Sequence, residues 1–178
     1  GPLVWVYPFD EYHAWAYNQP GRLSEVYYGD WFIRQALNNG LPLNTVISTT
    51  SFRSAIQKKP DMFRESVLVT IVPDAGTDLE KSLIQFVENG GKLIIFGPTG
   101  HAGDAFKNLL NLKNETALEG EFTIKNRYQP DQLATPFPAR INHRSLFNGG
   151  GITSVIGNRK AGGTKPLVQF EQKGTQRD

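Results

Sequence analysis

Four residues whose side chains are suited to chemistry lie close together near the start of the chain, in the segment "FDEYHAW". Asp10 and Glu11 supply carboxylates, His13 an imidazole and Trp15 an indole. Aromatic rings stack on the apolar faces of sugars, while carboxylates accept hydrogen bonds from sugar hydroxyls, so this combination suits a carbohydrate ligand. The segment follows a strand-like run, and open α/β sheets bind ligands at the carboxyl ends of their strands.

The aromatic and polar composition of residues 8–22 shows no helical period and predicts a loop. In an extended loop alternate residues project the same way, which places Glu11, His13 and Trp15 on one side and Asp10 on the other. The plainer interpretation is a solvated loop whose aromatic rings pack on a helix end or on a neighbouring chain. Sugar contact is the main alternative, because an E-x-H string by itself does not define a metal site.

A second segment, "KLIIFGPTGHAG" at residues 92–103, has the order strand, sharp turn and helix that presents the nucleophile in several α/β enzymes. The turn carries Thr99 and His101, yet an internal threonine is a poor nucleophile without a strong adjacent base. The segment therefore predicts a tight turn before a helix, with Thr99 or Asp104 as the cap. Ligand or anion binding at exposed N–H groups of this turn is the alternative.

Several nucleophiles and acid pairs are missing from the sequence. The chain has no cysteine, which excludes disulfides, thiolate metal sites and a cysteine nucleophile. It has no G-x-S-x-G elbow, and Asp10 and Glu11 are its only directly adjacent acids. Neighbours on an extended segment point to opposite faces, whereas glycoside hydrolysis needs two carboxyl groups that flank one bond. We therefore predict no catalytic residue, no metal site and no cofactor.

The composition is that of a folded domain, with 178 residues, 39% hydrophobic and 20% charged. The net charge of +2 is too small to indicate a nucleic-acid partner. No apolar run approaches the roughly 20 residues of a membrane helix, so no membrane partner is expected. No signal peptide is visible, and the abrupt strand-like start favours a fragment of a larger protein.

The elements that must position these residues alternate between strand and helix over the first 112 residues. One helix is expected to begin near Ser24, as its N-cap, and to end at Gly40. Another begins with the T-x-x-E capping box of Thr77 and Glu80. This rhythm predicts a parallel, flavodoxin-like sheet flanked by helices. The expected strands lie at residues 3–7, 43–49, 65–73 and 92–96.

The character of the sequence changes after about Lys113. Alternating segments and turns predict that residues 113–178 are a β-rich extension of the same domain, added at the edge of the sheet to an α/β core over residues 1–112. A separate second domain is the alternative. The glycine-rich stretch at residues 147–152 has neither the following helix nor the lysine of a phosphate loop, so it indicates a hairpin or bulge. His143 and Arg144 are predicted to be surface residues.

Three segments resemble the class I glutamine amidotransferase-like fold, in particular the trimerisation domain of family-forty-two β-galactosidases and related glycoside hydrolases. "VWVYPFDEYHAW" is similar to the opening strand and acidic, tryptophan-rich loop of that domain. "YYGDWFIRQALNNGLPLNTV" is similar to its first helix and the following turn. "VLVTIVPDAGTDLEKSLIQFVENGGKLIIFGPTG" is similar to its strand, helix, glycine pair and strand. The resemblance ends near Leu112.

The resemblance implies a domain that lost the amidotransferase cysteine and belongs to a larger, carbohydrate-active protein of bacteria. Its expected partners are other domains of that protein or further copies of the chain. Carbohydrate is a further expected ligand. A periplasmic or secreted location of a soluble protein would fit. The alternative is a small hydrolase or sugar-binding unit with its own pocket at the carboxyl edge of the sheet.

Overall fold

The computed structural model describes residues 2–42, 44–114, 121–126, 140–144, 155–157, 168–172 and 175–177, with side chains as far as Lys113. The chain forms two compact units, Gly1–Phe106 and Lys107–Asp178, and each is described by itself. The expected division into a core over residues 1–112 and an extension over residues 113–178 stays a prediction.

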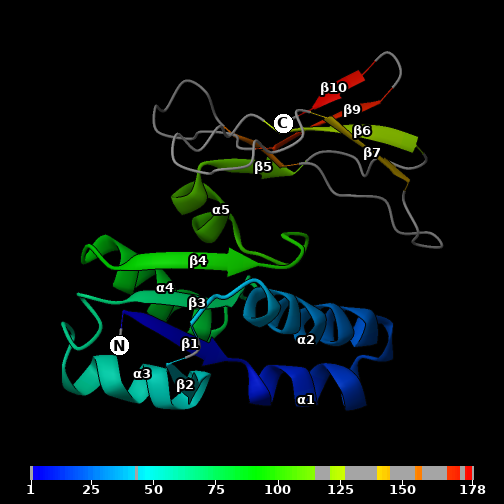
Figure 1. Ribbon diagram of the computed structural model, residues 1–178. Coiled ribbons are helices and arrows are strands. Elements are labelled where there is room, and N and C mark those ends of the chain that lie inside the picture. The colour runs from blue at the N-terminus through cyan, green and yellow to red at the C-terminus, as the bar shows by residue number, and fades with distance from the viewer. Residues whose placement is uncertain are drawn as a thin grey trace. The chain divides into compact units, whose positions relative to one another are not determined.

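The first unit contains a four-stranded parallel sheet (Figure 1). Its strands lie in the order β2-β1-β3-β4, and Trp5 of β1 pairs with Val46 of β2 on one side and Val69 of β3 on the other. The predicted parallel, flavodoxin-like sheet is therefore confirmed. The bounds are Leu3–Tyr7 for β1, Thr45–Ser48 for β2, Val67–Ile71 for β3 and Lys92–Phe96 for β4.

Helices cover both faces of this sheet, because the chain leaves β1 first toward β2 and then returns past β1 to β3. Right-handed crossovers in opposite directions place their helices on opposite faces. Phe32 of α2 packs against Trp5 on one face. Phe52 of α3 meets Phe86 of α4 at 6.0 Å between ring centroids. The helices span Leu23–Asn38 for α2, Thr49–Lys58 for α3 and Asp78–Glu88 for α4.

The core lies in the two central strands, whose alternate residues feed the two helical layers. Trp5 and Val69 face α2 and are 1% and 0% exposed. Leu68 of β3 and Leu83 of α4, on the opposite side, are both fully buried. β4 is more open than β1 and β3, since Ile94 is 44% exposed.

Helix ends agree with the local sequence signals at most positions. Gly40 and Gly90 both adopt φ of +84° just after α2 and α4. Each donates its N–H to a carbonyl of the last turn, of Leu37 and Val87 respectively, at 2.9 Å. The residues that follow, Leu41 and Gly91, donate their N–H groups to the carbonyls of Ala36 and Phe86, which completes a Schellman motif at each helix end. Glycine adopts this left-handed conformation without the steric cost of a Cβ.

The predicted loop at residues 8–22 is wrong, because this segment is helical. α1 spans Phe9–Asn18, and a short 3-10 helix, η1, spans Pro20–Arg22. Tyr12 and Trp15 are buried one turn apart, and that spacing is helical. The many aromatic residues obscured the pattern, since several of them remain exposed. α2 follows at once from Leu23, so Ser24 lies inside the helix and is not its N-cap.

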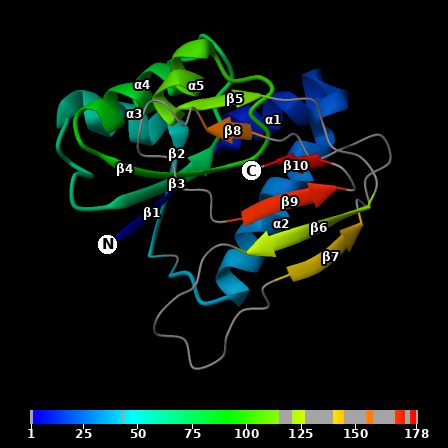
Figure 2. The ribbon, with the colours of Figure 1, turned by 90° about the horizontal axis from the view of Figure 1, so that it is seen from above.

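The second unit is rich in β-structure, as Figure 2 shows. Its larger sheet is antiparallel with the order β10-β9-β6-β7, and β5 pairs with β8. α5 precedes these strands and begins in the first unit. The proline-rich residues 129–139 and the glycine-rich residues 147–152 lie outside the described part of the chain. The bounds are Asp104–Leu110 for α5, Leu112–Asn114 for β5, Glu121–Asn126 for β6, Arg140–Arg144 for β7, Val155–Gly157 for β8, Val168–Gln172 for β9 and Thr175–Arg177 for β10.

Candidate functional site

The carboxyl edge of the parallel sheet is the place to look for a site, because the strand order reverses between β1 and β3. Flavodoxin-like sheets bind ligands outside the strand ends at such a switch point. The segments that follow the strands there include α1 after β1, residues 72–77 after β3 and residues 97–103 after β4.

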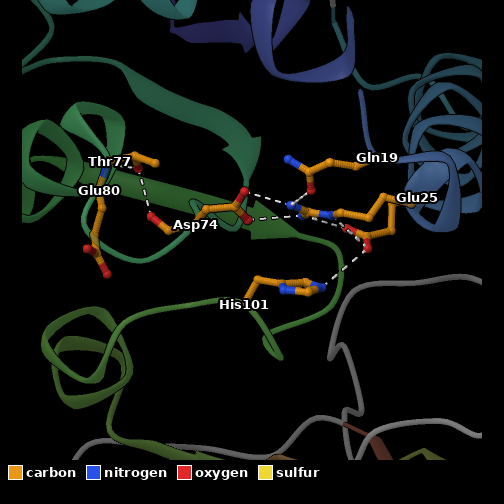
Figure 3. A network of polar contacts seen from close by, with 7 residues as sticks. Gln19, Glu25, Asp74, Thr77, Glu80 and His101 are labelled. Carbon is orange, nitrogen blue, oxygen red and sulfur yellow. Dashed lines mark hydrogen bonds and ion pairs between the residues drawn. The ribbon is translucent and has the colours of Figure 1, made fainter. Parts of the chain in front are cut away.

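The switch point is occupied by a buried arginine, Arg22, which comes from η1 and is 9% exposed. Its guanidinium donates to both carboxylate oxygens of Asp74, at 2.6 and 3.0 Å. It also donates to both carboxylate oxygens of Glu25, at 3.1 and 2.9 Å. Figure 3 shows the carboxylates of Asp74 and Glu25, which both form ion pairs with Arg22.

The guanidinium of Arg22 has no N–H donor left for a ligand. A guanidinium carries five N–H donors. Four are used by Asp74 and Glu25, and Gln19 accepts a further bond at 3.4 Å. Trp15 covers the guanidinium with its ring centroid at 3.7 Å, as in a cation–π contact. Burial alone lowers the pKa of Arg22, but its hydrogen bonds with Asp74 and Glu25 outweigh burial and raise it.

A second buried charged group, Glu80 of α4, joins two loops at this edge. Thr77 caps α4 by accepting the N–H of Glu80 at 3.2 Å, as predicted. The carboxylate of Glu80 accepts the N–H groups of Gly76, at 2.7 Å, and of Gly103, at 3.0 Å. The capping box is therefore only half formed, because the glutamate ties the β3–α4 loop to the β4–α5 loop instead.

The segment that resembled a nucleophile elbow, residues 97–103, is a turn held by backbone hydrogen bonds. Thr99 is 8% exposed, and its carbonyl accepts the N–H of Ala102 at 3.2 Å. The carbonyl of His101 accepts the N–H of Ala75 at 2.8 Å. The His101 ring is half-exposed, with Nε2 3.8 Å from a carboxylate oxygen of Glu25. The tight turn is as expected, while a capping role for Thr99 or Asp104 stays a prediction.

The predicted grouping of Glu11, His13 and Trp15 on one side is wrong, because it assumed an extended chain. Residues four apart share a helix face, whereas residues two apart do not. Glu11 and Trp15 therefore lie on one face of α1. His13 is exposed on another and packs against Tyr17 with ring centroids 4.6 Å apart and the rings tilted by 42°.

The two acids of α1 bind hydroxyl groups at the start of α3. Asp10 accepts a hydrogen bond from Thr50 at 2.9 Å, and Glu11 accepts one from Thr49 at 3.0 Å. Burial raises the pKa of Glu11, helped by the charge of Asp10, and the hydrogen bonds to its carboxyl and the charge of Arg53 only partly oppose this. Its raised pKa makes Glu11 the candidate residue best suited to act as a general acid.

The six predicted residues do not form one site, although Trp15 and His101 both lie against the hydrogen-bonded pair of Arg22 and Glu25. Trp15 packs on Arg22, Glu11 and Asp10 bind α3, and His101 lies beside Glu25. Among the described residues no three His, Asp or Glu side chains could hold a metal ion. Nor does a helix of that part of the chain have the length and apolarity to span a membrane.

Sequence reasoning missed the residues that form the network. Arg22 and Asp74 lie 52 positions apart, so no local pattern joins them. Asp74 had a usable signal, because it follows the buried β3 directly and had to lie at the carboxyl edge. Glu80 was identified only as half of a capping box.

Two hollows lined by described residues lie toward the opposite, amino edge of the sheet. One, of about 440 Å³, adjoins the end of α2, where Phe32, Ala36 and Leu41 line it. The other, of about 240 Å³, adjoins the end of α4 and is lined by Phe86 and Asn89, among others. Neither includes a predicted site residue.

The exposed surface of α1 and α2 is unusually apolar. Of the described large hydrophobic side chains, ten are exposed, and seven of these belong to the two helices. Polar residues normally occupy the solvent face of a surface helix. Clusters of exposed apolar side chains mark binding surfaces more often than isolated ones do. The seven are Phe9, Tyr17, Leu23, Tyr27, Tyr28, Trp31 and Leu37.

Comparisons of the chain with family models, with curated proteins and with solved structures find no match.

Proposed function

We propose that the chain is a non-catalytic, amidotransferase-like domain of a larger carbohydrate-active protein, where it serves assembly or completes a partner domain's site. The observation that carries the proposal is the apolar surface of α1 and α2, with Tyr27 and Trp31 68% and 60% exposed. Large aromatic side chains dominate protein interfaces, because they bury much area at little entropic cost. The link to carbohydrate chemistry rests on the family resemblance.

The carboxyl edge supports the non-catalytic part of this proposal. Its central cation, Arg22, is saturated by Asp74 and Glu25. Each carboxylate holds two N–H groups of the buried guanidinium, and none remains for a ligand, so the network supports the interpretation of a structural clamp rather than a ligand site. The turn at Thr99 is held by backbone hydrogen bonds from Ala102 to Thr99 and from Ala75 to His101.

One observation favours the alternative, a small hydrolase or sugar-binding unit. Glu11 combines a raised pKa with a position at the carboxyl edge, which is the environment of many general acids. Its carboxylate, however, accepts a hydrogen bond from Thr49 and so serves to join α1 to α3. The assembly function is therefore the better supported of the two.

The test is turnover by the full chain of chromogenic glycosides, chromogenic esters and glutamine. We expect no activity above buffer with any of them. The controls are Glu11→Gln, which keeps a hydrogen-bond acceptor for Thr49, and Thr99→Ala. Turnover that either substitution abolishes in a folded protein would reject the assembly function and establish the hydrolase.

A further inference from the structure

A stripe of six side chains runs along the solvent face of α2. At roughly 100° per residue, these positions fall within about one third of the helix circumference. Four of the six are large and hydrophobic, with exposed fractions from 38% for Leu23 to 68% for Tyr27. The α2 stripe consists of Leu23, Tyr27, Asp30, Trp31, Arg34 and Leu37.

The charges within the α2 stripe are one acid and one base near its middle. Arg34 Nε lies 2.9 Å from a carboxylate oxygen of Asp30, and the two side chains are 73% and 48% exposed. An exposed pair of this kind contributes little within its own helix. The same two charges are, however, available to a partner whose charges run in the opposite order.

We infer that the α2 stripe binds the α2 stripe of a second copy of this chain, with the two helices antiparallel. The inference rests on the proposed assembly function and names its partner. Asp30 and Arg34 are equally distant from residue 32, and so are Tyr27 and Leu37. An antiparallel pair centred there places Asp30 of each copy opposite Arg34 of the other. It also places Tyr27 opposite Leu37.

This arrangement has the self-complementarity that a two-fold axis demands, in which residue i meets j and j meets i. A parallel pair would instead place Asp30 against Asp30 and Arg34 against Arg34. Like charges in contact oppose association, so the charge order selects the antiparallel form. α2 has 16 residues and a length of roughly 24 Å, which accommodates the whole stripe.

The chain carries its own probe for this contact. It has three tryptophans, of which Trp5 and Trp15 are 1% and 5% exposed and Trp31 is 60% exposed. Quenching of fluorescence by acrylamide therefore reports mainly on Trp31. Self-association shields this ring as the protein concentration rises. Cover by residues 107–178 of the same chain shields it at every concentration.

The decisive experiment is sedimentation velocity of the full chain from about 1 to about 300 µM, the range expected for a small interface. We expect a monomer–dimer equilibrium. Asp30→Arg and Arg34→Asp each place like charges across the interface and should weaken the dimer at least about tenfold. An equimolar mixture of the two variants restores opposite charges at both contacts. It should associate although neither variant does so alone.

Lys81→Asp on α4 is the matched control, since it reverses one exposed charge beside Asp78 and should leave association unchanged. Circular dichroism of each variant verifies that α2 is retained. A monomer at all concentrations, or a mixture that does not associate, overturns the inference. Trp31 shielded at every concentration in a monomer likewise overturns it, in favour of the chain's second unit. Failure of the assembly function itself appears separately, as Glu11-dependent turnover.

Discussion

The helices α2 and α4 cover opposite faces of the same sheet, yet the side chains on their solvent-facing surfaces differ in polarity. α4 buries Leu79, Leu83 and Phe86 and keeps its exposed positions polar or charged. α2 packs Phe32 against the sheet and also exposes Tyr27 and Trp31. Core formation accounts for the apolar residues of α4, but it does not account for those on the outside of α2. The difference indicates that α2 has a second surface to bury.

The comparison is tested most strongly by two identical substitutions, Leu83→Ala in α4 and Leu37→Ala in α2. Leu83 is fully buried, whereas Leu37 is 41% exposed. Leu83→Ala should lower the free energy of unfolding by about 2–5 kcal/mol, because it leaves a cavity in the core. Leu37→Ala should change it by no more than about 0.5 kcal/mol at low protein concentration. Urea denaturation of both variants measures the two values, and equal losses would contradict the comparison.

The contrast between these helices also shows what sequence reasoning could achieve. Local sequence signals identified the strands, the cap of α4 at Thr77 and the glycine stop at Gly40, since each depends on neighbouring residues. The same signals missed α1 and predicted a loop there, because exposed aromatic side chains hid the helical spacing of Tyr12 and Trp15. They could not find the pair of Arg22 and Asp74, because that contact is set by the strand order.

The inner face of α2 should be packed as tightly as that of α4, even though its outer face is open. A Cβ added at Gly29 would overlap the Tyr12 hydroxyl, whereas one added at Gly21 meets nothing within 4 Å. Gly29→Ala should therefore destabilise by about 1–3 kcal/mol through overpacking of α1 against α2. Gly21→Ala is the control and should be close to neutral in thermal denaturation. A neutral Gly29→Ala would mean that α1 does not pack closely on α2.

The two helices also begin differently. α4 is capped by Thr77, whereas α2 has Arg22 at the cap position without a side-chain cap bond. Thr77→Ala should cost about 1 kcal/mol in free energy of unfolding, and Thr77→Ser should restore most of it. Ser24→Ala should cost nothing or stabilise slightly, because Ser24 lies inside α2 and alanine is the better helix former. Comparable losses for Thr77→Ala and Ser24→Ala would restore Ser24 as the cap.

The smallest effect should come from Glu11, and it depends on pH. Burial raises the pKa of Glu11 in the folded chain above its ordinary value. The folded state then holds the proton more tightly than the unfolded state, so the contribution of this group to stability falls as pH rises through the interval between the two pKa values. Glu11→Gln stays neutral throughout and keeps an acceptor for Thr49.

Relative to the wild type, Glu11→Gln should therefore gain stability from about pH 4 to about pH 7, above the ordinary glutamate pKa. Glu88→Gln, at an exposed position at the end of α4, controls for the loss of one negative charge. Urea denaturation at a series of pH values gives the difference in free energy of unfolding for each variant. A gain for Glu11→Gln that grows with pH would mean that the Glu11 carboxylate is a cost to the fold. A loss that grows with pH would mean that ionised Glu11 stabilises the fold, contrary to its half-buried position on α1 against α3.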